Sequence, residues 1–430
     1  MSLSKPWIMM SLYMDPIYQS EVGRKTRAKN KIIVVFLALA IILGLIFGYF
    51  WVAYPTTSPF KSFNYFLFGM THPHQKMTKQ VTGFLPYWRL EDAKYLHFDL
   101  LSEIVYFSLS VNGDGEIIKV VGNETNPGWL QWNNSIVKDL IPQTQLSGGK
   151  FSLVIAAQNN KIIENILDSE TAQNKLIKET IYQIKTRHLN GIVLDFEFSG
   201  DPGARYQEKF TKFSTNLASA IKLDSPNVGL SLTLLPLSGR HLGLFDLSKL
   251  SNIYDRFIGM SYDYYSSSSD IAGPVAPMNG FGEGKYFYDI SNSYKDYQKY
   301  IPTAKIIMGV PYYGWDWPVE NASEKLSKTL VQNDKNGYAV VMSYGRMKQN
   351  QNLKQTGCHF DELAKENWCG YVDPESKVPH QVWFEDERSL GIKYDFAKKN
   401  NFSGIAIWVL GYDKDLPNLW NLLKERFAAK

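Results

Sequence analysis

The sequence predicts an α/β fold, a (β/α)₈ barrel that carries an inserted α+β subdomain and is preceded by one N-terminal transmembrane helix. Three observations support this prediction. Eight short apolar runs rich in β-prone residues alternate with stretches compatible with helices. The gap between the seventh and eighth runs is much longer than the other gaps. An uncharged apolar segment near the N-terminus is long enough to cross a bilayer.

The N-terminal region divides into a basic tail, an apolar segment and a linker. Residues 32–53 are almost wholly apolar, and a run of about 20 such residues spans a bilayer as a helix. Basic residues lie just before this segment, whereas none follows it until Lys61. The positive-inside rule predicts that residues 1–31 are a cytoplasmic tail, 32–53 a signal anchor and 54–79 a linker. We therefore expect a single-pass cell-membrane protein with an extracytoplasmic C-terminal domain; a cleaved signal peptide is the alternative.

Residues 80–430 are predicted to form the barrel. Its strands are expected at Val81–Leu85, Glu103–Leu109, Lys150–Ala156, the run through Ile192–Leu194, Val228–Leu235, Arg256–Tyr262, Lys305–Val310 and Ser403–Val409. Helices are expected between them at Glu170–Thr186, Tyr206–Ile221 and Ser291–Tyr300. Eight strands alternating with helices are typical of a TIM barrel, whose active site lies where the strands end.

Residues 312–401 are predicted to form the inserted subdomain. This long gap contains strand-like pieces of its own at Tyr338–Met342 and Gln381–Phe384. It also contains the two cysteines, Cys358 and Cys369, which we expect to form a local disulfide outside the cytoplasm. Two cysteines without a CxxC pair make a poor zinc site, so no metal is expected.

The fourth predicted strand ends in two acids. Asp195 and Glu197 follow an apolar run and stand two residues apart, so both carboxylates project from one side of the extended chain. Two acids that share a confined site repel each other, which raises the pKa of one of them. This arrangement suits a general acid with a hydrogen-bonding neighbour. Solvated acids at an exposed strand end are the alternative.

Aromatic and acidic residues recur at the ends of the other predicted strands: Tyr87, Trp88, Tyr262, Asp263, Tyr312, Tyr313 and Trp408. Their gathering on one rim favours a binding cleft there. The aromatic content of 14% fits a sugar-binding cleft, although large barrels also bury many aromatic residues. The net charge of +4 is mild and argues against a dedicated nucleic-acid binder.

With these motifs in view, the region from Val81 to the C-terminus resembles glycoside hydrolase family 18. The family signature Asp-Gly-x-Asp-x-Asp-x-Glu corresponds to residues 190–197, which read NGIVLDFE. Further family blocks match at residues 260–263 (MSYD), 309–314 (GVPYYG) and 404–408 (GIAIW). Residues 382–389, 408–411 and 273–276 look like the branch that contains bacterial spore-cortex and cell-wall hydrolases, which act on peptidoglycan.

The resemblance implies a retaining, substrate-assisted hydrolysis of polymers that contain N-acetylglucosamine, with no cofactor. It implies that Glu197 is the general acid, that Asp195 supports the reacting acetamido group, and that Tyr262 aims that group. It places further substrate contacts at Asp263, Trp408 and Met260, with neighbouring subsites expected at Tyr87, Trp88, Tyr312 and Trp317. The expected partners are a polysaccharide such as peptidoglycan or chitin and, through the N-terminal helix, a membrane; we expect a monomer.

Three departures from the family pattern stand out. The first and middle Asp of the signature are Asn190 and Val193, and the third strand lacks the family's Ser-x-Gly-Gly. The middle Asp usually helps the acid at the position of Asp195 to change partners and ionisation, so the pH optimum is open to change here.

Two rival functions remain. A chitinase or endo-N-acetylglucosaminidase would use the same barrel on another polymer. A non-catalytic sugar-binding protein would also use this barrel, but such proteins typically lack the acid that is retained here as Glu197.

Overall fold

The structure is a computed structural model that describes residues 29, 31–45 and 61–429. The chain divides into two compact units, residues 1–67 and 68–430. In the first unit residues 31–45 are helical and expose their apolar side chains. Within the described ranges no helix is both long enough and apolar enough to cross a membrane. Residues 46–53 of the predicted anchor and most of the predicted tail lie outside the described residues, so the anchor stays a prediction.

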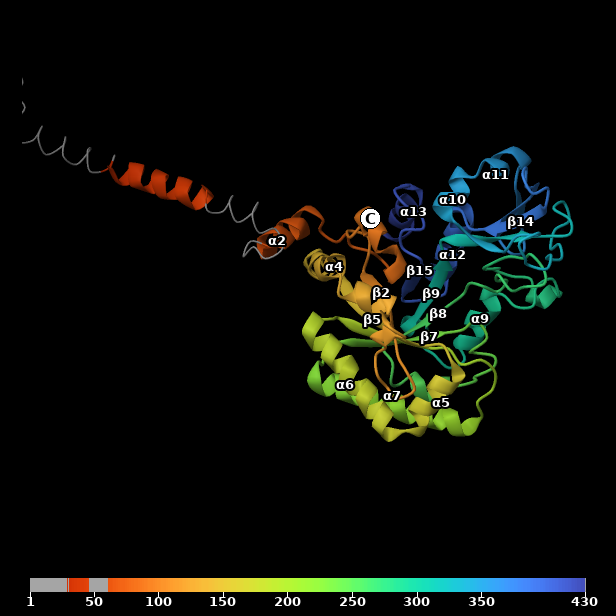
Figure 1. Ribbon diagram of the computed structural model, residues 1–430, viewed down its shortest axis with the longest axis horizontal. Coiled ribbons are helices and arrows are strands. Elements are labelled where there is room, and N and C mark those ends of the chain that lie inside the picture. Colours follow the sequence, from red (N-terminus) through yellow and green to blue (C-terminus); the bar gives the residue numbers. More distant parts are fainter. Residues whose placement is uncertain (1–28, 30, 46–60, 430) are drawn as a thin grey trace, which may run out of the picture. The chain divides into compact units, whose positions relative to one another are not determined.

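The second unit is built on a closed barrel of eight parallel strands, and all eight predicted strands are confirmed (Figure 1). The order around the barrel is β1-β15-β9-β8-β7-β6-β5-β2. Their bounds are β1 (Gln80–Pro86), β2 (Glu103–Ser110), β5 (Lys150–Ala157), β6 (Gly191–Phe196), β7 (Gly229–Leu234), β8 (Arg256–Gly259), β9 (Ile306–Pro311) and β15 (Gly404–Trp408). Because β8 ends at Gly259, Tyr262 and Asp263 lie in the loop that follows it.

Helices cover the outside of the barrel, and the three predicted ones are confirmed as α6, α7 and α9. Apart from α2 and the helices of the inserted subdomain, the helices of this unit are η1 (Tyr87–Tyr95), α3 (Pro127–Trp132), α4 (Ser135–Leu146), α5 (Asn160–Asp168), α6 (Glu170–Arg187), α7 (Ala204–Asp224), α8 (Leu247–Leu250), η2 (Phe281–Glu283), α9 (Ile290–Tyr297), η3 (Thr303–Lys305), α12 (Glu387–Lys399) and α13 (Asn418–Phe427). Local signals set their ends: Ser169 caps α6 by accepting a bond from the Ala172 N–H, and His188 ends it with a φ of 53°. A small hairpin, β3 (Val120–Val121) with β4 (Glu124–Thr125), follows β2.

The predicted linker at residues 54–79 contains a helix, α2 (Lys61–Thr71). From Phe68 onward this segment belongs to the barrel unit, where the Phe68 ring packs edge-on against Phe98 at 5.1 Å. The backbone N–H of Gln75 also donates to the Asp99 carbonyl at 2.7 Å. These contacts join the segment to residues distant in the sequence, so they leave no periodic pattern within the segment from which they could be predicted.

Between β9 and β15 the chain forms the predicted subdomain, a five-stranded sheet in the order β11-β10-β14-β13-β12 (Figure 1). Its elements are β10 (Tyr313–Pro318), β11 (Val340–Ser343), α10 (Tyr344–Gln349), α11 (Gln351–Thr356), β12 (His359–Asp361), β13 (Glu366–Val372) and β14 (Pro379–Phe384). The helix α12 contacts β9 and β15 and so belongs to the barrel layer. The predicted boundary at 401 therefore includes one barrel helix.

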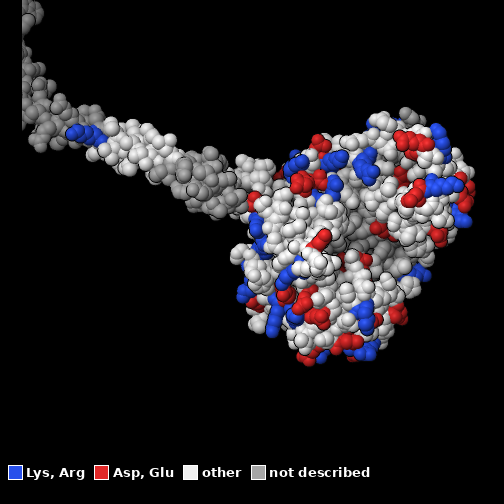
Figure 2. Space-filling model, in the orientation of Figure 1, with Lys and Arg blue, Asp and Glu red and all other residues white. Residues whose placement is uncertain are grey.

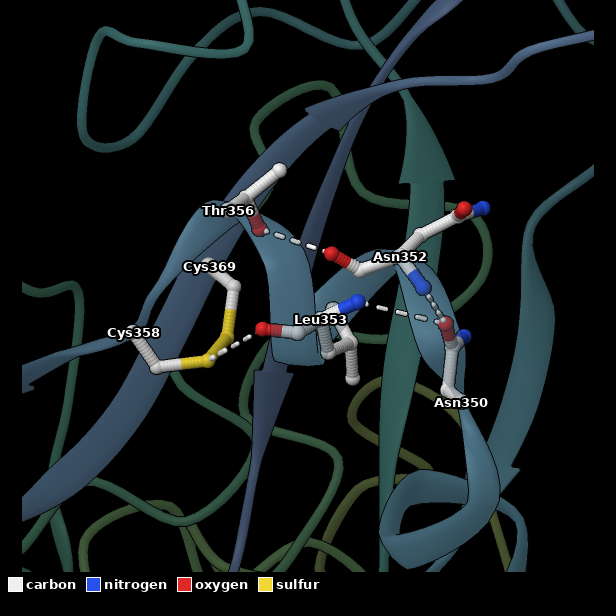
Figure 3. Close-up of a disulfide and its surroundings, with 6 residues drawn as sticks. All are labelled: Asn350, Asn352, Leu353, Thr356, Cys358 and Cys369. Atoms are coloured by element: carbon white, nitrogen blue, oxygen red, sulfur yellow. Dashed lines mark hydrogen bonds between the residues drawn. A yellow bond between two sulfur atoms is a disulfide. The ribbon is translucent and has the colours of Figure 1, made fainter.

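Cys358 and Cys369 form the predicted disulfide, which ties the end of α11 to β13 (Figure 3). The same turn is held by Asn350, whose side chain accepts bonds from the Asn352 and Leu353 N–H groups. At the C-terminal end of α11, the Thr356 hydroxyl donates to the Asn352 carbonyl at 3.1 Å. The bridge closes a short loop at the far edge of the sheet, away from β10.

Candidate active site

The carboxyl ends of β5, β6 and β7 place the two predicted acids in one cavity of about 240 Å³. The pairing register puts Leu194 of β6 beside Leu232 of β7 and Asp195 beside Ala156 of β5. The cavity is lined by Phe84, Phe107, Gln158, Asp195, Glu197, Thr233, Leu235, Pro236, Met260, Tyr262, Asp263 and Trp408. Six of the predicted site residues are thus brought together: Asp195, Glu197, Met260, Tyr262, Asp263 and Trp408.

Asp195 is fully buried at the end of β6. Its Oδ1 accepts a hydrogen bond from the Thr233 hydroxyl at 2.6 Å. Its Oδ2 has no hydrogen-bond partner among the described residues. Burial, and then the charge of nearby Glu197, raise the pKa of Asp195 to about 7, and the Thr233 bond opposes that rise. Asp195 therefore takes up a proton far more readily than a solvated aspartate does.

Beneath Asp195 the barrel interior is mostly apolar, although Ser231 of β7 pairs in register with Val193 and buries its hydroxyl there. Val193 points into the barrel with Phe84, Val105, Val154, Ala156, Ile258, Ile307 and Ala406. Valine at position 193, two residues earlier on the same face of β6, cannot form a hydrogen bond to the unpaired Oδ2 of Asp195.

Glu197 follows the last residue of β6 and is partly buried. Its Oε1 accepts a bond from the Gln158 amide at 2.6 Å. Burial raises the pKa of the Glu197 carboxyl, and the charge of Asp263 adds to this, whereas the Gln158 bond lowers it. The carboxyl is therefore disposed to hold a proton next to an open cavity, which is what a general acid needs.

Aromatic rings form the opposite wall. The Tyr262 and Trp408 rings lie nearly parallel, 9° apart in plane, with centroids 6.1 Å apart. Phe107 packs edge-on against Trp408 at 4.8 Å. Burial, followed by the charge of Asp195, raises the pKa of Tyr262 well above its ordinary value, so its hydroxyl stays a neutral donor.

Asp263 is held by the subdomain. Its Oδ1 accepts bonds from the Tyr313 hydroxyl at 2.7 Å and the Trp315 indole at 2.8 Å, both on β10. Its backbone lies in the left-handed region with a φ of 55°, which is costly for a residue with a side chain. Burial raises the pKa of Asp263 even though both hydrogen bonds lower it. The inserted sheet thus fixes one acid of the site.

A larger groove of about 820 Å³ adjoins the cavity and shares Leu235, Pro236 and Asp263 with it. The loops after β6, β7 and β8 form its walls, which are mostly apolar. An extended substrate can therefore continue from the cavity into the groove.

Four predicted contacts do not line the cavity. Tyr312 is buried behind the barrel wall, where its hydroxyl bonds that of Tyr394 on α12 at 2.8 Å. Trp317 is buried in the subdomain core and donates to the Ser266 carbonyl at 2.9 Å. Trp88 is 48% exposed and stands edge-on to Phe107 at 6.0 Å, with Tyr87 packed behind it. The structure therefore does not bring Tyr312 or Trp317 to the site and leaves Trp88 at its rim.

Sequence reasoning missed Gln158, Thr233 and Trp315, and committed to Tyr312 where Tyr313 faces the site. The choice between Tyr312 and Tyr313 depends on strand alternation, because neighbouring residues of an extended strand point to opposite sides. Gln158 directly follows β5, so its position at a strand end could also have been predicted from the sequence.

Asn190, the first departure from the signature, lies at the opposite end of β6 from the acids. Its Oδ1 accepts from the Phe151 N–H and from the Gln145 amide, each at 2.9 Å. It therefore links β6 to its neighbours at the foot of the barrel. No group of three or more metal-binding side chains occurs within the described part of the chain.

Comparison with known proteins gives a consistent result. A family model described as "Glycosyl hydrolases family 18" matches residues 80–413. The chain is 26% identical over 337 residues to the cortical fragment-lytic enzyme of Bacillus anthracis, covering 76% of this chain and 68% of that protein. It is 25% identical over 272 residues to the di-N-acetylchitobiase of Rattus norvegicus, covering 58% and 71%.

Solved structures share the fold. The spore cortex-lytic enzyme SleL of Bacillus megaterium QM B1551 aligns with a TM-score of 0.60 at 22% identity, covering 82% of this chain and 75% of that one. A chitinase of Cycas revoluta in complex with (GlcNAc)3 aligns with a TM-score of 0.65 at 18% identity, covering 81% and 99%.

Proposed function

Because the chain belongs to family 18 of the glycosyl hydrolases, we propose that it hydrolyses β-linked polymers containing N-acetylglucosamine, with peptidoglycan as the favoured polymer. One observation carries this proposal: Asp195 and Glu197 meet in one cavity at the carboxyl ends of the strands, both with raised pKa values. The similarity to a cortical fragment-lytic enzyme supports the choice of polymer. Chitin is the second candidate, supported by the likeness to chitin-degrading enzymes.

In this proposal Glu197 starts the reaction. Its carboxyl proton passes to the glycosidic oxygen as the bond from that oxygen to the anomeric carbon breaks. The acetamido oxygen of the same sugar forms a bond to the anomeric carbon, which gives a cyclic oxazolinium ion. Glu197, now ionised, later takes a proton from the water that opens this ring, so the anomeric configuration is retained.

The neighbours of Glu197 would guide the acetamido group. Asp195 lines the cavity and has one oxygen without a hydrogen-bond partner among the described residues; it would accept a hydrogen bond from the acetamido N–H and stabilise the developing positive charge. The neutral hydroxyl of Tyr262 would donate to the acetamido oxygen. Trp408 would form an apolar floor under the sugar, and Asp263 would accept a sugar hydroxyl.

The pH dependence of the activity should reflect the two coupled acids. We expect kcat/KM to fall as the pH rises through about 7, because the pair then loses the proton that Glu197 must donate. Thr233→Val should move this decline to higher pH, since the Thr233 hydroxyl lowers the pKa of Asp195. Steady-state kinetics between pH 4 and pH 9 would measure both. A decline centred near pH 4 would mean that the carboxyls behave as solvated groups.

The place of action is proposed from the sequence pattern. The basic residues before the apolar segment 32–53 favour a single-pass anchor with the barrel outside the cytoplasm. The polymer would then be reached from the outer face of the membrane.

Product analysis tests the function. The purified protein would be incubated with peptidoglycan and, separately, with chitin, and the products identified by mass spectrometry. We expect new reducing ends on muropeptides, with a lower rate on chitin. Faster release from chitin would favour the second candidate. Binding to both polymers without any product would identify a non-catalytic sugar-binding protein and overturn the proposal.

A further inference from the structure

The segments that follow β5 and β6 stay joined after the barrel strands end. The Glu197 N–H donates to the Ala157 carbonyl at 2.9 Å, which extends the strand ladder by one step. Beyond that step the chains separate, because α5 begins at Asn160 while the β6 segment enters an exposed loop. Two side chains from the β5 segment bridge the gap, and each makes contacts on the segment that carries Glu197.

The first bridge reaches the carboxyl itself. The Gln158 amide donates to Oε1 of Glu197 at 2.6 Å. Because Oε1 accepts this hydrogen bond, it is a less favourable site for the acid proton than Oε2. The proton of the neutral carboxyl is therefore bound to Oε2. The bond thus chooses which oxygen donates to the substrate.

The second bridge holds the backbone two residues farther on. The Asn160 side chain pairs with both backbone groups of Ser199: its Nδ2 donates to the carbonyl at 2.8 Å, and its Oδ1 accepts from the N–H at 2.8 Å. A two-bond pairing fixes the orientation of a peptide as well as its position. The loop needs such support, since Gly200 and Gly203 follow with φ values of 84° and 79°.

We propose that Gln158 and Asn160 form an amide clamp of two positioning residues, in which Gln158 assigns the acid proton of Glu197 to one oxygen and Asn160 holds the loop behind it. The inference rests on the proposed role of Glu197 as the general acid. Both clamp residues act through Glu197 and the loop that follows it.

A pair of substitutions at position 158 gives opposite expectations. Gln158→Met keeps the length of the side chain but removes the donor, so the carboxylate loses a stabilising bond. The decline of kcat at high pH should then move up by about half a unit or more, and kcat at the optimum should fall about tenfold with KM within about twofold. Gln158→Lys keeps a donor and adds a positive charge, which should move the decline to lower pH.

The matched control is Gln173→Met on α6, whose amide donates only to a backbone carbonyl, that of Leu167 at 3.0 Å. It should leave kcat and the pH profile unchanged. Shifts in the same direction for Met and Lys at position 158, or no shift for either, would overturn the role of Gln158. A purely structural role would change the melting temperature without producing opposite shifts.

The clamp also predicts coupling between its members. Asn160→Ala should lower kcat several-fold, and the double variant with Gln158→Met should lose less than the product of the two single losses. The reason is that a loosened loop already misplaces the carboxyl that Gln158 contacts. Independent, multiplicative losses would show that Asn160 does not act through Glu197.

Failure of this inference can be told from failure of the proposed function. If the wild-type chain releases no product from any polymer, the proposed function fails. If the wild type turns over and the Gln158 and Asn160 variants match it, the clamp alone is wrong.

Discussion

Glu197→Gln is expected to lower kcat on peptidoglycan by at least about 1,000-fold. The amide keeps the shape of the side chain and can still meet Gln158, but it has no proton to give to the leaving oxygen. General acid catalysis typically contributes about 10²–10⁴ to the rate, and here the same group must also activate water in the second step. Initial rates of reducing-end release would measure the loss.

Binding separates a lost reaction from a lost fold. The Glu197→Gln variant should still bind saccharide fragments with an affinity within about threefold of the wild type, measured by calorimetry, because the aromatic wall is intact. Glu208→Gln on the exposed surface of α7 is the matched control and should retain full activity. Retained turnover by Glu197→Gln would exclude this residue as the acid, whatever polymer is used.

The position of the acids could be predicted from the sequence because it depends on two local rules. An apolar run long enough for a buried strand placed Asp195 at a strand end, and the two-residue repeat of a strand placed Glu197 on the same side. The closed barrel then gathered the other strand ends on one rim, as alternation of strands and helices implied. Figure 2 shows basic and acidic side chains interspersed over the visible face, which agrees with the mild net charge.

The partners of the acids could not be predicted, because they depend on register between strands. Thr233 meets Asp195 only because Leu232 pairs with Leu194 in the barrel. Asp263 and Trp315 are 52 residues apart in the chain and meet through the inserted sheet. Neither relation leaves a periodic pattern in a single sequence.

The Val193 departure has a clearer meaning in the structure than in the sequence. From the sequence it was a missing acid of the signature. In the folded barrel Val193 packs in an apolar cluster and offers no hydrogen bond to Asp195, one of whose oxygens has no partner among the described residues.

A buried ion pair joins the subdomain to the barrel. Lys393 on α12 and Glu385, just after β14, are fully buried, with Nζ 2.6 Å from Oε1. Glu366 of β13 lies beside them and accepts bonds from the Val275 and Ala276 N–H groups of the loop after β8. Burial, with a contribution from the charge of Glu385, raises the pKa of Glu366 to about 8. One cation thus balances a pair of buried acids that hold this loop and sheet together.

Lys393→Met should accordingly lower the free energy of unfolding by about 3–5 kcal/mol, because removing one partner leaves an uncompensated buried charge. Lys348→Met is the matched control: its ion pair with Glu387 is 2.9 Å long but about one third exposed, so the loss should stay below about 1 kcal/mol. Urea denaturation at pH 8 would measure both.

The double variant Lys393→Met with Glu385→Met should recover most of the loss, since no unpaired charge then remains at position 385. The pH dependence gives a second check. Burial raises the pKa of Glu385, so in Lys393→Met the folded state gains stability at low pH as this carboxyl takes up a proton, and loses it as the pH rises. The deficit should therefore be smaller at pH 5 than at pH 8. A deficit that is equal at both pH values, with no recovery in the double variant, would mean that Lys393 acts by packing and not by charge.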